Sequence, residues 1–144
     1  MNVTIAIPTG QRTEQAVEVV RAWQEAGVRV VVFTWDPDTR AALMRERPWA
    51  KRLKHELFKS QEATVNKLWL GDRASFGRLQ NYMAANTPDW DVLICGADDL
   101  WPDKGTDLIG KAAQEVPGAI LWAGDGLFNE QPTHPIITRG WYDT

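Results

Sequence analysis

The sequence contains a single cysteine, Cys95, among its 144 residues. One cysteine cannot form a disulfide within the chain, so no internal cross-link of this kind stabilises the fold. Cys95 ends the apolar run Val92–Cys95, and a thiol in such a run is typical of a small core side chain and not of a catalytic nucleophile. A disulfide-bonded scaffold is therefore excluded, and thiol chemistry is disfavoured.

Long apolar runs and an excess of positive charge are also absent. No apolar stretch approaches the roughly 20 residues that a membrane-spanning helix requires, and the N-terminal MNVTIAIPTG lacks the basic residues of a secretory leader. The formal net charge is -3 and the pI is about 5.4, so general attraction for nucleic acid or an anionic membrane is not expected. These absences predict a cytoplasmic protein that binds any anion locally.

Strand-like and helix-like segments alternate at the start of the chain. The sequence pattern predicts a strand over Met1–Ile7 and a helix over Thr13–Ala26. Thr13 is the expected N-cap of this helix, and Gly27 lies just beyond its end. The nearly continuous apolar run Val28–Phe33 predicts a strand that is covered on both faces. Strand, helix and strand then form a βαβ unit, whose two strands we expect to be parallel.

The rest of the chain continues the alternation less regularly. Asp38–Lys59 is helix-prone but is interrupted by Pro48. The other predicted elements are a short strand within Ala63–Trp69, a helix from Asp72 or Ser75 to Asn86, strands at Val92–Cys95, Ala119–Ala123 and Ile136–Thr138, and a helix over Thr106–Val116. This pattern predicts one domain over residues 1–144, a three-layer α/β fold of Rossmann-like type with a mostly parallel central sheet.

Open α/β sheets bind ligands beyond the carboxyl ends of their strands, and three loops of this chain begin at such ends. The first is IPTGQR, which supplies Pro8, Thr9, Gly10 and Arg12. A glycine lets the backbone approach a ligand, and an arginine offers a fork of donors to a phosphate or a base edge. A plain Pro-Thr-Gly turn is the alternative interpretation.

The other two loops carry acidic residues. In FTWDPD, Thr34 and Asp36 can accept from a nucleobase N–H or a ribose hydroxyl, although Asp-Pro-Asp is also an ordinary turn and helix cap. In GADD, adjacent carboxylates at a strand end repel each other unless a cation or solvent relieves them, and hard divalent ions prefer oxygen ligands. Asp98 and Asp99 are therefore predicted to bind Mg²⁺ or Mn²⁺.

His134 and Asp125 are further candidates for chemistry. His134 precedes the last expected strand, where it can complete a metal shell, act in acid–base catalysis, or be purely structural. Asp125 follows another strand end, in WAGDG, and can face the same cleft. The eight tryptophans, several of them in expected loops, are either packing residues or stacking platforms for a sugar or a base.

Together these segments resemble the donor-binding half of family 2 glycosyltransferases, enzymes of the glycosyltransferase A fold that use nucleotide-diphospho-sugars. IPTGQR is similar to the family's opening Ile-Pro-Thr-Tyr-Asn-Arg, from which Gly10 and Gln11 depart. VVVFTWDPDT is similar in position to the strand that ends in Asp-Asp-Gly-Ser. The stretch Arg78–Pro102 resembles Ala-Arg-Asn, a helix, a strand and Asp-x-Asp-Asp, with Gly96 at the first aspartate of Asp-x-Asp and Asp98 at the last.

The resemblance implies a nucleotide-diphospho-sugar donor, a divalent cation and transfer of the sugar to an acceptor hydroxyl. It implies that Asp98 reaches the cation with Asp99 beside it. In inverting members the catalytic base normally lies beyond the segment that GWYD resembles. We therefore expect the chain to lack an acceptor region, so that Asp125, His134 or a second copy of the chain supplies the base. The nucleotide-binding residues that the resemblance implies are Pro8, Thr9, Gly10, Arg12, Thr34, Asp36 and Arg78.

Two other functions remain open. Gly96 in place of an aspartate, and the expected lack of an acceptor region, favour a non-catalytic module that binds a nucleotide-sugar without turnover. The Asp36-Pro37-Asp38 sequence after a strand superficially resembles the motif of haloacid dehalogenase-type phosphatases, although that family carries it on its first strand. Tight binding without transfer distinguishes the module from an enzyme, and a phosphatase assay on Asp36→Asn tests the last interpretation.

Overall fold

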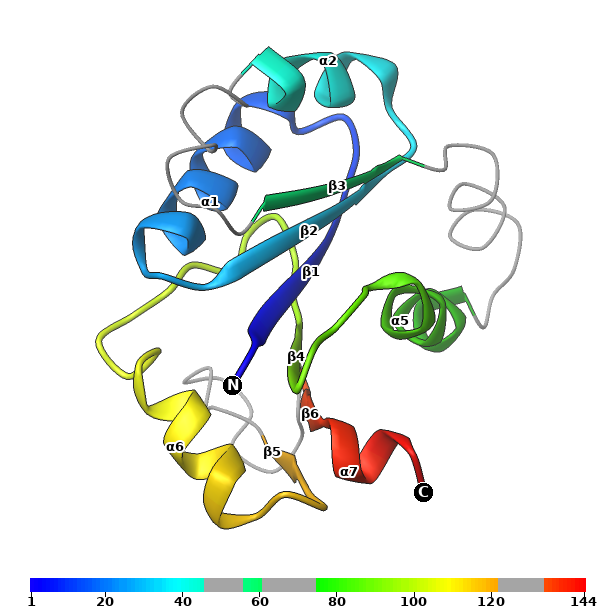
Figure 1. Ribbon diagram of the computed structural model, residues 1–144. Coiled ribbons are helices and arrows are strands. Elements are labelled where there is room, and N and C mark those ends of the chain that lie inside the picture. The colour runs from blue at the N-terminus through cyan, green and yellow to red at the C-terminus, as the bar shows by residue number, and fades with distance from the viewer. Residues whose placement is uncertain (46–55, 61–74, 122–133) are drawn as a thin grey trace.

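The computed structural model describes residues 1–45, 56–60, 75–121 and 134–144 (Figure 1). In this part of the chain six strands form one open sheet in the order β3-β2-β1-β4-β6-β5. β3, β2, β1 and β4 are parallel neighbours, whereas β6 runs antiparallel to both β4 and β5. The predicted α/β class and the mostly parallel sheet are thus confirmed. The strands are β1 (Val3–Thr9), β2 (Arg29–Thr34), β3 (Glu56–Ser60), β4 (Val92–Cys95), β5 (Ile120–Leu121) and β6 (Ile136–Thr138).

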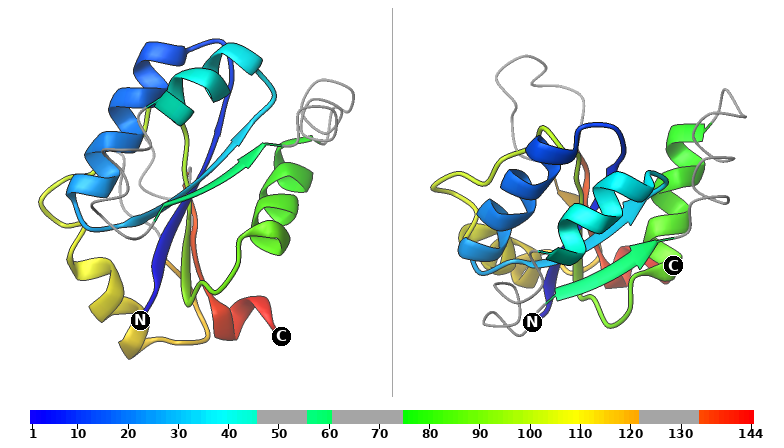
Figure 2. Two further views of the ribbon diagram at one scale, coloured as in Figure 1. Left: turned by 45° about the horizontal axis from the view of Figure 1, so that its top comes forward. Right: turned by 90° about the horizontal axis from the view of Figure 1, so that it is seen from above.

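Helices cover both faces of this sheet. On one side lie α1 (Thr13–Glu25), α2 (Pro37–Arg45) and α6 (Leu108–Glu115), and on the other side lie α5 (Ser75–Asn86) and α7 (Arg139–Tyr142) (Figure 2). Side chains alternate along β1, so that Ile5 and Ile7 belong to the core under α1 while Ala6 belongs to the core under α5. The chain therefore buries two apolar cores, one on each face.

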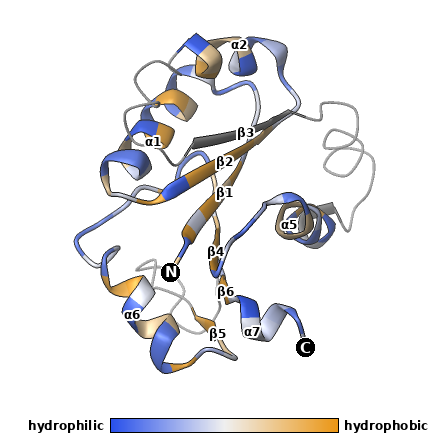
Figure 3. Ribbon diagram, in the orientation of Figure 1, coloured by the Kyte–Doolittle hydropathy of each residue, from blue (hydrophilic) through white to orange (hydrophobic). Residues whose placement is uncertain are grey.

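The central strands are apolar, as Figure 3 shows for β1 and β2. They are apolar because both of their faces are buried. Under α1, Val19 and Trp23 pack on the sheet from one stripe of the helix. On the opposite face Leu79 and Trp90 are almost fully buried, and the Trp90 indole Nε1 donates to the backbone oxygen of Ala84 at 3.1 Å. The one polar atom of this large side chain is thereby satisfied within the core.

The end of α1 follows from a single glycine. Gly27 has φ +80°, a conformation that strains any residue with a Cβ atom. The Gly27 amide donates to the oxygen of Gln24 at 3.0 Å, and the Val28 amide donates to the oxygen of Trp23 at 3.1 Å. This pair of bonds is the Schellman motif, which satisfies terminal carbonyl groups of a helix. The predicted position of Gly27 beyond the helix end is confirmed.

The helix-prone interpretation of Asp38–Lys59 is wrong at its C-terminal end. α2 stops at Arg45, and Glu56–Ser60 forms β3, which pairs in parallel with β2. Pairing with a neighbouring strand outweighs local helix propensity here. The structure does not describe the intervening residues 46–55, and the strand expected within Ala63–Trp69 also lies outside the described residues.

The role of Thr13 also differs from the prediction. It is the first residue of α1, the N-cap residue is Arg12, and the cap has no side-chain hydrogen bond. The Thr13 hydroxyl instead lies 2.9 Å from the hydroxyl of Thr39, near the start of α2. A contact between two helix starts thus replaces the local cap. The sequence analysis did not predict the short helix α7, which follows β6.

Candidate functional site

The loops that follow β1, β2 and β4 meet at one edge of the sheet, because these parallel strands place their carboxyl ends side by side. Two of the predicted residues, Thr9 and Thr34, are the last residues of β1 and β2 and not loop residues as expected. Arg12, Asp36 and Asp98 lie in the segments that follow β1, β2 and β4. The structure brings Thr9, Arg12 and Asp98 into direct contact. Segments that are far apart in sequence thus form one cluster.

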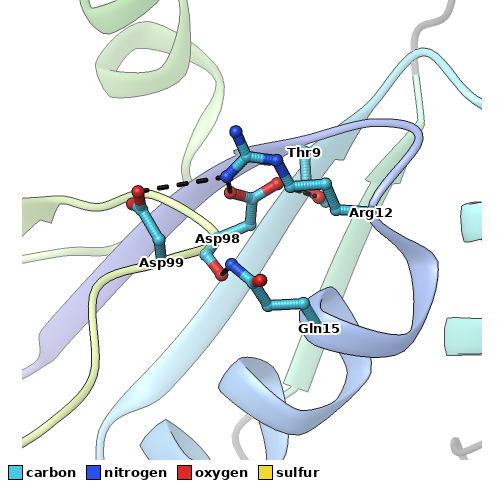
Figure 4. Close-up of polar contacts among 5 residues, drawn as sticks. All are labelled: Thr9, Arg12, Gln15, Asp98 and Asp99. Carbon is cyan, nitrogen blue, oxygen red and sulfur yellow. Dashed lines mark hydrogen bonds and ion pairs between the residues drawn. The ribbon is translucent and has the colours of Figure 1, made fainter.

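Asp98 is the centre of this cluster (Figure 4). The Thr9 hydroxyl donates to Asp98 Oδ2 at 2.9 Å, and Arg12 Nη1 donates to Asp98 Oδ1 at 3.2 Å. The side chain of Asp98 is 13% exposed, and Thr9 is buried. Both oxygens of this carboxylate therefore have protein donors, which hold the side chain in one orientation.

Arg12 joins the two acidic residues predicted to bind a metal. Its Nη1 atom lies 3.9 Å from Asp99 Oδ2, in addition to its contact with Asp98. The side chains of Arg12 and Asp99 are 58% and 63% exposed, so water screens this second pair strongly. One positive and two negative formal charges leave the cluster with a net negative charge, which favours a further cation.

Two residues of α1 that the sequence analysis did not single out hold the loop after β4. The Gln15 side-chain amide donates to the backbone oxygen of Asp98 at 2.7 Å, and the Trp23 indole donates to the backbone oxygen of Leu100 at 2.7 Å. Gln15 lies three residues after Arg12, on the same face of the helix start. A polar residue at that spacing from a candidate ligand was the signal available in the sequence.

Gly96 lies at the first aspartate position of the resembling motif. A Cβ atom at this position would lie 2.7 Å from Ile5 Cδ1 and Cγ1 and 3.1 Å from the backbone oxygen of Ala6. The Gly96 amide donates to that same oxygen at 2.9 Å, so the backbone of β1 passes very close. The glycine is therefore required by packing, and an acidic side chain does not fit here without a shift of β1 side chains.

Asp36 acts as a helix cap. Its Oδ2 atom accepts hydrogen bonds from the Thr39 amide at 3.1 Å, the Thr39 hydroxyl at 2.6 Å and the Gln11 amide at 3.4 Å. The hydrogen bond from the Thr39 side chain is the main cause that lowers the pKa of Asp36 below 3.8, although slight burial opposes it. Asp36 thus stabilises the start of α2 and ties the first loop to the second.

The neighbours of Asp36 are mostly enclosed. Thr34 is 2% exposed, and its hydroxyl accepts from the Asp36 amide at 3.2 Å. Pro8 lies within β1 opposite Phe33. The indole of Trp35 occupies the space that a side chain at Gly10 would need, which explains the glycine at that position. Trp35, which follows β2, therefore packs against the first loop.

Of the two catalytic candidates, the structure describes His134 but not Asp125. His134 Nδ1 lies 3.2 Å from the backbone oxygen of Cys95 at the end of β4, so the ring lies at the same sheet edge as the Asp98 loop. Asp125 lies outside the described residues. Arg78 is exposed near the start of α5, and the described contacts of Asp98 do not include it. The structure thus places His134 beside the end of β4, where the loop of Asp98 begins.

Cys95 plays the structural part that the sequence predicts. It is 4% exposed, and burial raises the pKa of its thiol to about 12. Near neutral pH the side chain is therefore the neutral thiol, which is a poor nucleophile. The residue is a small apolar part of the core next to the candidate site.

The residues present suit a hard divalent cation that arrives with a ligand. Asp98 and Asp99 offer carboxylate oxygens, which Mg²⁺ and Mn²⁺ prefer. In residues 1–45, 56–60, 75–121 and 134–144, however, no three acidic, histidine or cysteine side chains gather as a complete metal shell. One or two carboxylates plus phosphate oxygens and water are a usual shell for Mg²⁺ bound with a nucleotide. Asp98 and Asp99 match the protein share of such a shell.

A cavity of about 410 Å³ lies away from this chemistry, between α6 and the strands β5 and β6. None of its lining residues has an ionisable side chain. It is therefore an apolar hollow beside the sheet and not an extension of the acidic cluster. The lining residues are Gly105, Leu108, Ile109, Ala112, Ile120, Leu121 and Ile136.

Comparisons add no assignment to this geometry. Within the part of the chain that the structure describes, no helix combines the length and the apolar character needed to cross a membrane. No protein-family model, curated protein or solved structure matches the chain. The resemblance described above therefore rests on the sequence motifs alone.

Proposed function

We propose that the chain is a glycosyltransferase-like protein with a nucleotide-diphospho-sugar transferase fold. In this proposal it binds a nucleotide-diphospho-sugar at the carboxyl edge of the sheet and transfers the sugar to an acceptor hydroxyl. The observation that carries the proposal is the cluster of Thr9, Arg12 and Asp98, since the motifs of the resembling family lie in the two loops that meet there.

Each residue has a definite part in this proposal. Mn²⁺ or Mg²⁺ held by Asp98 and Asp99 would neutralise the diphosphate leaving group. Thr9 holds the Asp98 carboxylate in place, because its hydroxyl donates to Oδ2. Arg12 offers further guanidinium donors to the phosphates. These three contacts define the phosphate end of the proposed site.

The base or ribose end is assigned to the second loop. All three hydrogen bonds that Thr39 and Gln11 donate to Asp36 end on Oδ2. The Asp36 carboxylate, to which the backbone of Asp38 also donates, is the group proposed to accept from a ribose hydroxyl or a base N–H. Thr34 takes part by holding the Asp36 amide.

His134 is the proposed general base. In the neutral ring whose Nδ1–H donates to the oxygen of Cys95, 3.2 Å away, the other nitrogen, Nε2, is the one that can accept a proton. That proton would come from the acceptor hydroxyl as it attacks the anomeric carbon, while the bond to the diphosphate breaks. Asp125 remains a sequence-based candidate for the same step.

Calorimetric titration tests the proposal. Purified protein is titrated with UDP, GDP, CDP and dTDP, first with Mn²⁺ and then with a chelator. One nucleotide should bind with Mn²⁺ and lose about tenfold or more in affinity with chelator, since the cation bridges Asp98 and the phosphates. Failure of all four nucleotides to bind under both conditions would remove the proposal.

Asp98→Asn is the first variant to measure. Loss of one carboxylate charge should reduce Mn²⁺-dependent nucleotide affinity by about tenfold or more. Asp107→Asn is the matched control, because Asp107 is an exposed aspartate at the start of α6 whose side chain makes no cap hydrogen bond. Equal loss in both variants would show that general surface charge, and not the Asp98 site, binds the nucleotide.

A non-catalytic module is the second candidate. Gly96 leaves no room for another carboxylate, and both oxygens of Asp98 are engaged by protein donors. These features favour binding without turnover. A protein that binds one nucleotide-sugar but neither hydrolyses it nor transfers its sugar to any acceptor tested would belong to this class.

A further inference from the structure

Arg12 occupies the place that a metal ion needs on Asp98. Its Nη1 atom is 3.2 Å from Asp98 Oδ1 and 3.9 Å from Asp99 Oδ2, the two carboxylates with which a cation would bind. A divalent ion on Asp98 would lie beside the guanidinium, and two positive charges at such a distance repel strongly in a partly buried site. The arginine and the metal therefore compete for the same carboxylate.

The exposure of the two partners of Asp98 shows which one can leave. Thr9 is buried within the end of β1, so its hydroxyl stays on Oδ2. Arg12 is 58% exposed and touches the carboxylates through Nη1, while its other terminal nitrogen points away from them (Figure 4). A partly exposed ion pair of a long side chain is weak enough to break when a better partner arrives.

From these contacts we infer that Arg12 is an internal counterion, which a divalent cation displaces from Asp98 only when a diphosphate is present to receive the guanidinium. The inference rests on the proposed function, because it concerns how the proposed site loads its cation. Bare metal meets an occupied carboxylate and binds weakly. A metal–nucleotide complex supplies both the cation for Asp98 and the phosphate oxygens for Arg12.

Binding of Mn²⁺ alone tests this exchange. The loss of the electron paramagnetic resonance signal of free Mn²⁺ is measured on the full chain without nucleotide. Arg12→Gln should bind Mn²⁺ about tenfold more tightly than the wild type, since it removes a positive charge next to Asp98. Arg12→Lys, which keeps the charge, should stay within about threefold of the wild type.

Two further variants act as controls. Lys111→Gln removes the same charge from α6. The neighbouring Gly110 lies near Val3 and Met1, at the amino end of β1 and thus at the other end of the strands from Asp98. This variant should leave Mn²⁺ affinity unchanged. The double variant Arg12→Gln with Asp98→Asn should lose the tight binding that Arg12→Gln gains. This loss would place the new Mn²⁺ site on Asp98.

The outcomes separate the inference from the proposed function. Equal Mn²⁺ affinity of the wild type and Arg12→Gln, together with nucleotide binding that depends on Mn²⁺ and Asp98, overturns the exchange and leaves the proposed site standing. A gain in Mn²⁺ affinity that survives Asp98→Asn also overturns it. If neither protein binds Mn²⁺ alone or with any of the four nucleoside diphosphates, the proposed function and the inference both fail.

Discussion

At the scale of single residues, the close packing of Gly96 explains the departure from an Asp-x-Asp motif. A Cβ atom at Gly96 would lie 2.7 Å from two side-chain atoms of Ile5 and 3.1 Å from the backbone oxygen of Ala6. Sequence reasoning could place Gly96 at the motif position, but it could not show this collision, which depends on the pairing of β1 with β4. Asp98 and Asp99 are thus the acidic side chains nearest to Gly96 in this loop.

Restoring the first aspartate should therefore damage the fold. Gly96→Asp is expected to lower the free energy of unfolding by about 1–3 kcal/mol, because the side chain overpacks the region around Ile5. Urea denaturation measures the effect. Gly118→Asp is the matched control, since nothing lies within 4 Å of a Cβ atom at Gly118. Equal stability of Gly96→Asp and the wild type would contradict the packing explanation.

Asp36 should give the stability a pH dependence. Its pKa is lower in the folded chain than the ordinary 3.8, mainly through the hydrogen bond from the Thr39 side chain. The stabilisation is therefore present above about pH 3.8 and is lost as the pH falls through the folded pKa. Asp36→Ala should lower the free energy of unfolding by about 1 kcal/mol at neutral pH, and this deficit should shrink below pH 3.8.

The measurement is urea denaturation of both proteins at neutral pH and at several acidic values. Asp107→Ala serves as the control at neutral pH, because Asp107 is the N-cap of α6 but its side chain makes no cap hydrogen bond. A deficit for Asp36→Ala that stayed constant down to the lowest pH would show that the carboxylate charge does not stabilise the cap.

At the scale of elements, α1 is the part that positions the site. Its N-cap is Arg12, its first turn supplies Gln15, and its last turn supplies Trp23, which holds the loop at Leu100. Its apolar stripe packs on the sheet, so these polar contacts are fixed relative to β1 and β4. Helical periodicity predicted this element, because the stripe recurs every three to four residues.

The end of α1 offers a test of this arrangement. Gly27→Ala is expected to lower the free energy of unfolding by about 1–2 kcal/mol, because alanine is strained at a positive φ. Gly118→Ala, where φ is not positive and nothing lies near the new Cβ atom, should change stability by less than about 0.5 kcal/mol. Thermal melts compare the two. Similar melting temperatures for both variants would rule out strain at Gly27.

At the scale of the whole molecule, the sequence predicted what depends on local pattern. The bounds of β4 agree with the prediction at Val92–Cys95, and the βαβ start of the chain is parallel as expected. The rule for strand ends also predicted that the loops of Thr9 and Asp98 share an edge. The features that the sequence analysis missed depend on tertiary partners. β3 forms because it pairs with β2, and the Asp98 carboxylate accepts a hydrogen bond from Arg12.

The cluster joins segments that are 86 and 89 residues apart in sequence. β1 can pair with β2 early, because a single helix separates them, whereas its pairing with β4 requires the chain between them to be in place. Contacts of such long sequence separation cost more chain entropy to close than local contacts do, and they slow folding. During synthesis, a nascent chain that has not yet extended past β4 holds Arg12 without its carboxylate partner, so the candidate site cannot assemble before the loop after β4 has been made.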